Sequence, residues 1–209
     1  MNDCDSWIEF PQHRKWFNKL YVAETFNYNC GPSGTSPQKS GKYVVRPIYN
    51  LSGMGLGSEI KFIEKGDLSK TPPGYFWCEY FEGIQYSVTF KYDKEWKQIS
   101  CFEGYNQEND LIKFEYWKRS NHSKKFPKEV TGLEDVNTVN IEFINENPIE
   151  IHLRDTPDPD YDIFIPIWKG EEYMIEELSI KDYKFIESFE DADGFLETPR
   201  MGFMVKNTC

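Results

Sequence analysis

Residues 138–154 read Thr-Val-Asn-Ile-Glu-Phe-Ile-Asn-Glu-Asn-Pro-Ile-Glu-Ile-His-Leu-Arg, and they are the most informative stretch of the chain. Two runs within it, Thr138–Ile144 and Ile149–Arg154, alternate between apolar and polar residues, as β-strands with one buried face do. The residues between the two runs, Asn-Glu-Asn-Pro, are typical of a turn. We therefore predict two strands joined as a hairpin.

The second of these strands carries its polar side chains on one face, because successive residues of a strand point to opposite sides: Glu150, His152 and Arg154. If the hairpin pairs across its turn, Glu142 lies on the neighbouring strand near Glu150. Two carboxylates suit Mg²⁺, a hard cation that prefers oxygen ligands, and His152 is a third candidate although imidazole binds magnesium less well. Alternation also produces an ordinary solvent-exposed polar face, so that interpretation stays open.

A second candidate segment lies about a hundred residues earlier. Tyr43–Arg46 reads as a short strand, and the glycines Gly53, Gly55 and Gly57 follow it. A strand that delivers a cation beside a glycine-rich loop can bind polyphosphate through backbone N–H groups and the side-chain charge. The segment lacks the Gly-Lys-Ser/Thr of a Walker sequence, and a glycine-rich run is more often a plain loop.

A third segment, residues 76–88, contains an acidic and aromatic stretch around Gly83 between two apolar runs. As a hinge it would connect two lobes, and its backbone groups could hydrogen-bond an adenine edge while apolar side chains enclose the ring. The competing interpretation is a β-hairpin with a mildly acidic turn.

Near the amino terminus, apolar residues from His13 to Asn27 recur at helical spacing, which predicts a helix. Lys15 and Lys19 lie on this helix, and either could reach a phosphate, although exposed helical lysines are usually just solvated. Aromatic and β-branched runs predict five more strands, at Tyr75–Phe81, Ile84–Tyr92, Trp96–Phe102, Leu111–Trp117 and Ile163–Trp168.

The composition excludes several classes of protein. A net charge of -11 over 209 residues repels nucleic acid and anionic membranes, so we expect neither as a partner. No apolar run approaches the roughly 20 residues that span a bilayer. Five cysteines without a CxxC pair do not indicate a disulfide framework or a zinc site, and the amino terminus lacks the pattern of a signal peptide. We expect a cytoplasmic protein.

Taken in order, the segments resemble the ATP-grasp superfamily. In that family a lysine-bearing helix precedes a V-V-K-P strand and a glycine-rich loop, an E-x-x-x-G-x-E hinge follows, and two late strands end with an acidic residue and E-x-N-x-R. The matching segments here are Val44–Pro47, Gly53–Gly57, Glu79–Gln85, and Glu142 with Glu150–Arg154. Arg46, Gln85 and His152 stand where the family usually has lysine, glutamate and asparagine.

The resemblance implies an α+β fold: one domain over residues 1–209, with two small lobes of mostly antiparallel sheet and a nucleotide cleft between them. Residues 36–80 would form the small lobe, and residues 1–35 and 81–209 the larger lobe and tail. The resemblance also implies site roles. ATP would bind at Lys19, Arg46, Gly53, Gly55, Glu79, Tyr80, Phe81 and Gln85. Glu142, Glu150 and His152 would bind Mg²⁺, and Arg46 and Arg154 would act in catalysis.

The implied activity is that of an ATP-dependent ligase, which activates a small-molecule or peptidic carboxylate as an acyl phosphate and joins it to an amine or a thiol. Two alternatives stay open. One is an ATP-grasp-like protein that binds nucleotide without turnover. The other is an acidic, β-rich interaction or structural protein without a ligand. The sequence indicates neither the oligomeric state nor a role for the acidic tail from Glu171 to Cys209.

Overall fold

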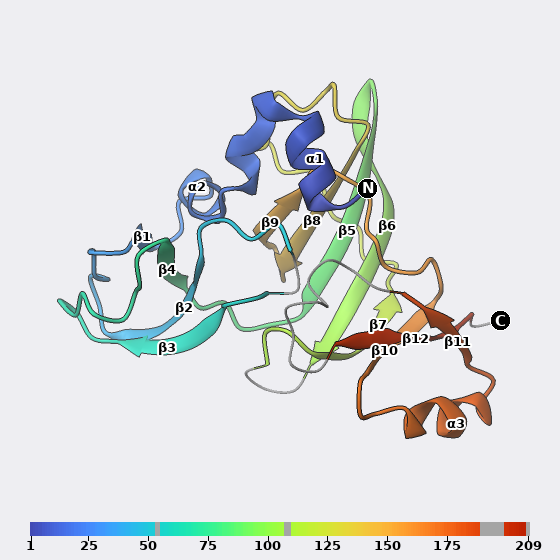
Figure 1. The fold of residues 1–209 in the computed structure, drawn as a ribbon. Helices are drawn as coiled ribbons and strands as arrows, with labels where there is room; N and C mark the ends of the chain where they lie inside the picture. The colour runs from blue at the N-terminus through green and yellow to red at the C-terminus, as the bar shows by residue number, and fades with distance from the viewer. Residues whose placement is uncertain (53–54, 107–109, 189–198, 208–209) are drawn as a thin grey trace.

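The computed structural model describes residues 1–52, 55–106, 110–188 and 199–207 (Figure 1). The helices within them are α1 (Asp3–Glu9), the 3₁₀ helix η1 (Pro11–Phe17), α2 (Lys19–Thr25) and α3 (Tyr173–Ser179). The strands are β1 (Cys30–Pro32), β2 (Gly41–Pro47), β3 (Glu59–Ile63), β4 (Tyr75–Glu79), β5 (Gln85–Asp93), β6 (Glu95–Asn106), β7 (Phe114–Arg119), β8 (Thr138–Ile144), β9 (Asn147–His152), β10 (Ile163–Trp168), β11 (Lys184–Glu187) and β12 (Arg200–Lys206).

These strands form two sheets, and the strand pairs described within them are antiparallel. The four-stranded sheet has the order β1-β4-β2-β3, and the eight-stranded sheet has the order β11-β12-β10-β7-β6-β5-β8-β9. Figure 1 shows the small sheet to one side of the large one, with α1 and α2 near the edge that β8 and β9 form. The predicted α+β class with mostly antiparallel sheets is confirmed.

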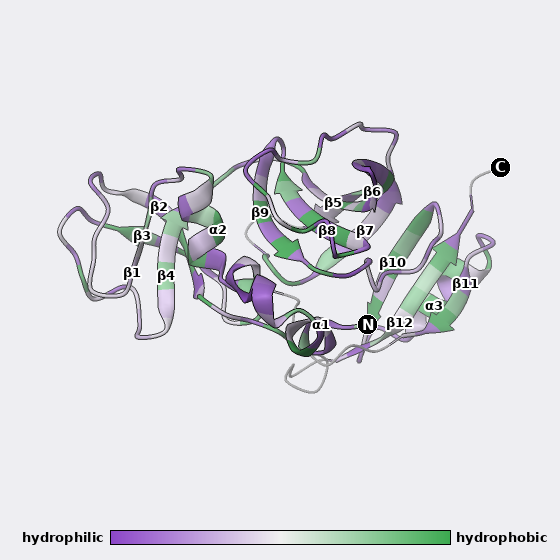
Figure 2. Cartoon of the chain, turned by 90° about the horizontal axis from the view of Figure 1, so that it is seen from above, coloured by the Kyte–Doolittle hydropathy of each residue, from purple (hydrophilic) through white to green (hydrophobic). Residues whose placement is uncertain are grey.

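The main core lies between the large sheet and the amino-terminal helices. Trp16, Phe17 and Val22 from η1 and α2 pack against buried residues of β5, β8 and β9, among them Val88 and Ile141. A second cluster joins β6, β7, β10 and β12 and includes Phe102, Trp117, Phe164, Phe203 and Val205. In Figure 2 the strands of the large sheet alternate between hydrophobic and hydrophilic residues, as a sheet with two differently covered faces requires.

The chain passes from one sheet to the other between β4 and β5, and Asn145 fixes this connection. The Asn145 side chain donates to the carbonyl of Glu82 at 2.9 Å and accepts from the N–H of Ile84 at 3.2 Å. Gly83 between them has φ +147°, and a Cβ there would come within 2.0 Å of the Asn145 amide. Because β4 and β5 belong to different sheets, the hairpin interpretation of residues 76–88 is wrong. The segment connects the two sheets, as a hinge would, and its contact with adenine stays a prediction.

The single helix predicted from His13 to Asn27 is wrong, because Asn18 divides it. Asn18 has extended backbone angles, and its side chain accepts from the N–H of Tyr21, so it caps a new helix that starts at Lys19. A side-chain cap of this kind satisfies N–H groups that a continuous helix would have used internally. Helical periodicity therefore identified the right region but not the break in it.

The predicted strands Thr138–Ile144 and Ile163–Trp168 have the observed bounds. The strand predicted at Leu111–Trp117 begins only at Phe114, because the Asp110 carboxylate accepts from the N–H groups of Ile112 and Lys113 and holds a turn there. The strand β12 lies in the acidic tail, where no strand was predicted. Within the described residues, no helix is long and apolar enough to cross a membrane.

Candidate functional site

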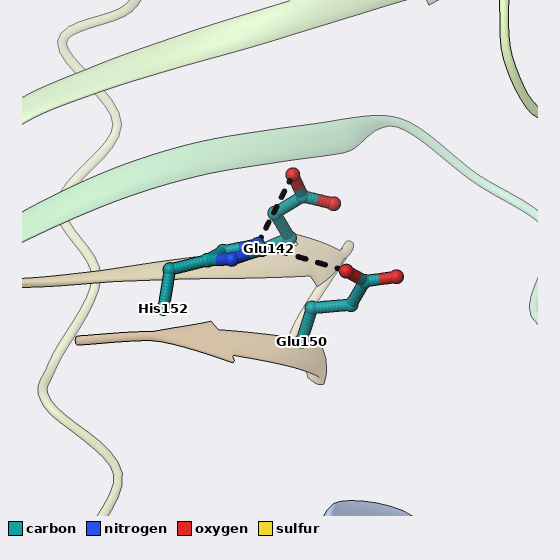
Figure 3. A group of neighbouring side chains, drawn as sticks. All are labelled: Glu142, Glu150 and His152. Atoms are coloured by element: carbon teal, nitrogen blue, oxygen red, sulfur yellow. Dashed lines mark ion pairs between the residues drawn. The ribbon is translucent and has the colours of Figure 1, made fainter. Parts of the chain in front are cut away.

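The hairpin of β8 and β9 brings Glu142 and Glu150 opposite one another, as direct partners in the strand register. His152 lies beside them, with Nε2 at 3.7 Å from a Glu142 oxygen and 3.6 Å from a Glu150 oxygen (Figure 3). One potential ligand atom from each of the three lies within 4.8 Å of the others. The Glu150 and His152 side chains are only 11% and 9% exposed, so the interpretation as a solvent-exposed polar face is wrong.

Two cations from other elements converge on Glu150. Lys19, the first residue of α2, forms an ion pair with one of its oxygens. Arg46 of β2 donates to the other oxygen at 2.9 Å and to the carbonyl of Ile149 at 2.8 Å. Burial by itself raises the pKa of Glu150, but Lys19, Arg46 and His152 outweigh it and hold the pKa well below its usual range. The cluster thus joins both sheets and α2.

Asp3 anchors the other end of this polar row. Its carboxylate faces His152 Nδ1 at 2.8 Å and accepts from Arg154 Nε at 2.7 Å and Nη2 at 3.2 Å. Burial opposes the charged form of both Asp3 and His152. Their mutual attraction nevertheless raises the pKa of His152 to about 9, and with Arg154 it keeps the pKa of Asp3 well below its usual range. Because the capped start of α1 supplies Asp3, the amino terminus belongs to the site.

A cavity of about 180 Å³ lies between the two sheets at this cluster. Nine residues predicted from the sequence line it: Arg46, Gly55, Glu79, Phe81, Gln85, Glu142, Glu150, His152 and Arg154. Lys19 and Tyr80 do not line the cavity. Lys19 nevertheless forms an ion pair with Glu150, which does line it. Gly53 lies outside the described residues. Nine of the predicted residues thus line one cavity, and their proposed roles there stay predictions.

The end of the cavity near the hinge is apolar. Phe81 packs edge-on against Tyr28 with ring centroids 4.8 Å apart, and Ala23, Val44 and Cys78 complete this wall. The Glu79 carboxylate accepts from the N–H of Asn29 at 3.0 Å, so this predicted residue also holds β4 to the segment before β1. A flat heterocycle suits an apolar slot that has backbone groups at its rim.

Gln85 connects the hinge to the carboxylates, since its Nε2 donates to Glu142 at 2.9 Å. Gly55 forms part of the opposite wall with φ +62°, and a Cβ there would meet the carbonyl of Leu111 at 2.7 Å. The described part of the glycine-rich loop therefore lies against the large sheet's β6–β7 connection and closes one side of the cavity.

Several residues that line the cavity were not predicted from the sequence. Ser87 and Asn140 form a buried polar floor, with Asn140 Nδ2 donating to Ser87 Oγ at 3.0 Å. Asp158, Trp168 and Arg200 line the far end. The apolar run Met201-Gly202-Phe203-Met204-Val205 could have predicted β12, but it does not reveal that Arg200 lines a cavity shared with residues from distant parts of the chain.

The residues at the centre of the cavity fit a metal-bound polyphosphate. Two carboxylates on adjacent strands offer the oxygen ligands that Mg²⁺ prefers. In the part of the chain that the structure describes, the buried Arg46 Nε has no hydrogen-bond partner, so one N–H of a cavity-lining guanidinium remains available to an anion. Lys19 and Arg46 supply two positive charges at the same place.

Comparison with solved structures places this arrangement in a known fold. An L-amino acid ligase of Bacillus licheniformis matches with a TM-score of 0.50 and 14% identity, over 68% of this chain and 41% of that chain. An N5-carboxyaminoimidazole synthetase of Staphylococcus aureus, solved with ADP, matches with a TM-score of 0.54 and 11% identity, over 93% of this chain and 68% of that chain. The chain shares the fold of these two enzymes, in agreement with the ATP-grasp-like fold predicted from the sequence.

A third match, an Archaeoglobus fulgidus protein described as belonging to the ATP-grasp superfamily, has a TM-score of 0.39, which is too low to support an argument. It is 16% identical over 68% of this chain and 46% of that chain. The chain thus spans less than half of two of these proteins and about two thirds of the third. Neither a scan against protein-family models nor a search of curated proteins gives a match.

Proposed function

We propose that this protein binds Mg·ATP in the cavity between its sheets and is an ATP-dependent ligase that activates a carboxylate for attack by an amine or a thiol. The observation that supports the proposal most directly is that Arg46, Glu142 and Glu150 line one cavity, with Lys19 paired to Glu150 behind its wall. An amino acid ligase and a synthetase solved with ADP have the same fold, which supports this reaction class.

In this proposal the ends of the cavity have different tasks. The apolar slot beside Phe81 and Tyr28 holds the base, with the Glu79 segment at its rim. Gln85 is placed to bond a ribose hydroxyl, because an amide can both donate and accept. Arg46 and Lys19 bind phosphate oxygens, and the backbone at Gly55, which lines the same cavity, can offer its N–H group to them.

Glu142 and Glu150 are the proposed metal ligands, and His152 has the third position predicted from the sequence. The nucleotide would supply the phosphoryl group, and the metal would neutralise the charge that develops during its transfer. Asp3 holds His152 through Nδ1 and thereby fixes the orientation of the ring toward the carboxylates. In the structure Glu150 forms ion pairs with Lys19 and Arg46. These pairs would have to be exchanged for contacts to phosphate and metal on binding.

A thermal-unfolding experiment tests the nucleotide part of the proposal. Because a ligand that binds only the folded state stabilises it, millimolar Mg·ATP should raise the melting temperature of the wild-type protein. In Glu142→Gln the Mg²⁺-dependent part of this increase should disappear, while the hydrogen bond from Gln85 can persist. Glu142 suits the test better than Glu150, because its side chain is 26% exposed and does not bond the two cations.

Release of ADP with a panel of carboxylates and amines tests turnover. A melting temperature that rises with Mg·ATP but no ADP release would favour the alternative of a nucleotide-binding protein without catalysis. No shift at all would remove both interpretations and leave the acidic interaction protein. The proposal includes a cytoplasmic location, since Cys30, Cys78 and Cys101 are thiols rather than disulfides.

A further inference from the structure

Among the described residues, one end of the cavity is lined by side chains that do not belong to the proposed nucleotide-binding segments. Strands β7, β10 and β12 and the loop after β9 line it, and Figure 1 shows β10 and β12 on the opposite side of β5 and β6 from β2 and β3. The residues at this end are Phe114, Trp117, Asp158, Trp168, Arg200 and Phe203. Four of these six are aromatic, so this end offers apolar walls around charged groups.

Arg200 is the cation of this end. It pairs with Trp168 in the register of β10 and β12, and it is 5% exposed. Its guanidinium lies 4.5 Å above the ring centroid of Phe203, and stacking of this kind fixes the plane of the guanidinium. A buried guanidinium held in one orientation at a cavity wall matches the planar geometry of a carboxylate, which it can bind through two parallel hydrogen bonds.

Arg154 lines the same cavity but has a different task. Its Nε and Nη2 donate to Asp3, and its Nη1 donates to the carbonyl of Asp155 at 3.0 Å. Because each guanidinium nitrogen is bonded within the protein, Arg154 stabilises the framework around Asp3 in this arrangement. The acyl-phosphate role predicted for it from the sequence would require these bonds to be exchanged.

Asp158 connects the two ends. Its side chain accepts from Thr156 Oγ1 at 3.0 Å, and its charge interacts with Arg200, Arg154 and Glu142. Asp158, Arg200 and Glu142 also line the same cavity, so the aromatic end adjoins the carboxylates of the proposed metal site. A substrate carboxylate at Arg200 would therefore lie on the side of the cavity that adjoins the reacting centre.

We propose that Arg200 binds the carboxylate of the acceptor substrate and that Trp168, Trp117 and Phe114 enclose its side chain. The substrate class is then a small carboxylic acid with an apolar or aromatic body. This assignment rests on the proposed function for its chemical meaning, but carboxylate binding can be measured without any nucleotide.

The experiment titrates the full chain with 3-phenylpropionate and with its neutral amide, using calorimetry, in the absence and presence of a non-hydrolysable Mg·ATP analogue. Wild-type protein should bind the acid and not the amide. Arg200→Gln should weaken binding of the acid by about tenfold or more, because a charge-assisted bidentate contact is lost. Arg200→Lys should retain part of the affinity. Arg119→Gln is the matched control, since Arg119 also stacks on a phenylalanine, Phe102, but lies outside the cavity.

Unchanged binding of the acid in Arg200→Gln would overturn this inference, and so would equal binding of acid and amide, or no binding by wild type under either condition. If Arg200→Gln does not fold by circular dichroism, Arg200→Lys and the acid–amide pair decide. Mg·ATP protection is measured on the same samples and should persist in Arg200→Gln. If the wild-type protein does not bind the acid but is still stabilised by Mg·ATP, only this inference is refuted and the proposed function stands. Carboxylate binding without Mg·ATP protection refutes only the nucleotide proposal.

Discussion

Arg46 of β2 and Glu150 of β9 form an ion pair at 2.9 Å across the two sheets, although 104 residues separate them in the sequence. The same guanidinium donates to the carbonyl of Ile149, so Arg46 holds both the side chain and the backbone of β9. Arg46 thus holds the two sheets together and is also the proposed phosphate-binding cation. We therefore expect ligand binding in the cavity to affect the relative position of the two sheets.

Arg46→Lys should remain folded and bind Mg·ATP about tenfold more weakly. An ammonium group keeps the charge but cannot reach Glu150, Ile149 and a phosphate oxygen in the planar arrangement of a guanidinium. Calorimetric titration with Mg·ATP measures the loss, and urea unfolding checks that the fold persists. Wild-type affinity in this variant, combined with a large drop in stability, would show that Arg46 is a purely structural residue.

Asp3→Asn should destabilise the fold by about 3 kcal/mol, because it leaves the buried cations His152 and Arg154 without their carboxylate. Urea unfolding measures the difference. The matched control is Asp135→Asn. Asp135 also contacts a histidine, His13, at 2.6 Å, but its side chain is 55% exposed, so the change should cost less than about 1 kcal/mol. Equal effects of the two substitutions would contradict the buried role of Asp3.

Gly83→Ala should destabilise the protein more than Gly74→Ala. Both glycines have positive φ, +147° and +83°, so alanine is strained at either position. A Cβ at Gly83 also collides with the Asn145 amide at 2.0 Å, whereas a Cβ at Gly74 meets nothing within 4 Å. The difference between the two melting temperatures therefore isolates the contact between Asn145 and the hinge. Equal melting temperatures would mean that Asn145 does not hold the hinge.

Cys30 should react slowly with iodoacetamide at pH 8 although it is half-exposed. Burial, with smaller contributions from Glu24 and Glu79, raises the pKa of its thiol to about 11, so little thiolate is present near neutral pH. The rate should be on the order of tenfold below that of an unfolded cysteine, since the more basic thiolate is also more nucleophilic. It should keep rising above pH 9. Mass spectrometry of the labelled peptide measures it, and labelling in urea should restore the ordinary rate. Equal rates in buffer and in urea would disprove the raised pKa.

Local patterns predicted the strands well where neighbouring residues alone decide them. The alternation in residues 138–154 gave the hairpin, and the hairpin in turn placed Glu142 opposite Glu150. The pattern could not show that this polar face is buried, because alternation is the same whether a face meets water or protein. Glu150 is buried because Lys19 of α2 and Arg46 of β2 pack against it, and both belong to other elements of the fold.

The same limit explains the errors. The spacing of apolar residues does not reveal a helix N-cap, so the break between η1 and α2 at Asn18 was not predicted. A contiguous acidic turn around Gly83 looks the same in a hairpin and in a passage between sheets, and only the partners of β4 and β5 distinguish the two. Asp3 and Arg200 lie near opposite ends of the chain and carry no local signal of a site.

The residue pattern was sufficient to predict the order of the segments, the hairpin with its two carboxylates, and the resemblance to the ATP-grasp fold. These features depend on spacing along the chain, which strand geometry converts directly into positions on a face. The tertiary structure alone decided which charges meet. Asp3 reaches Arg154 and Arg200 enters the cavity because buried charges are stable only beside partners or ligands, and sheet pairing brings those together from distant parts of the chain.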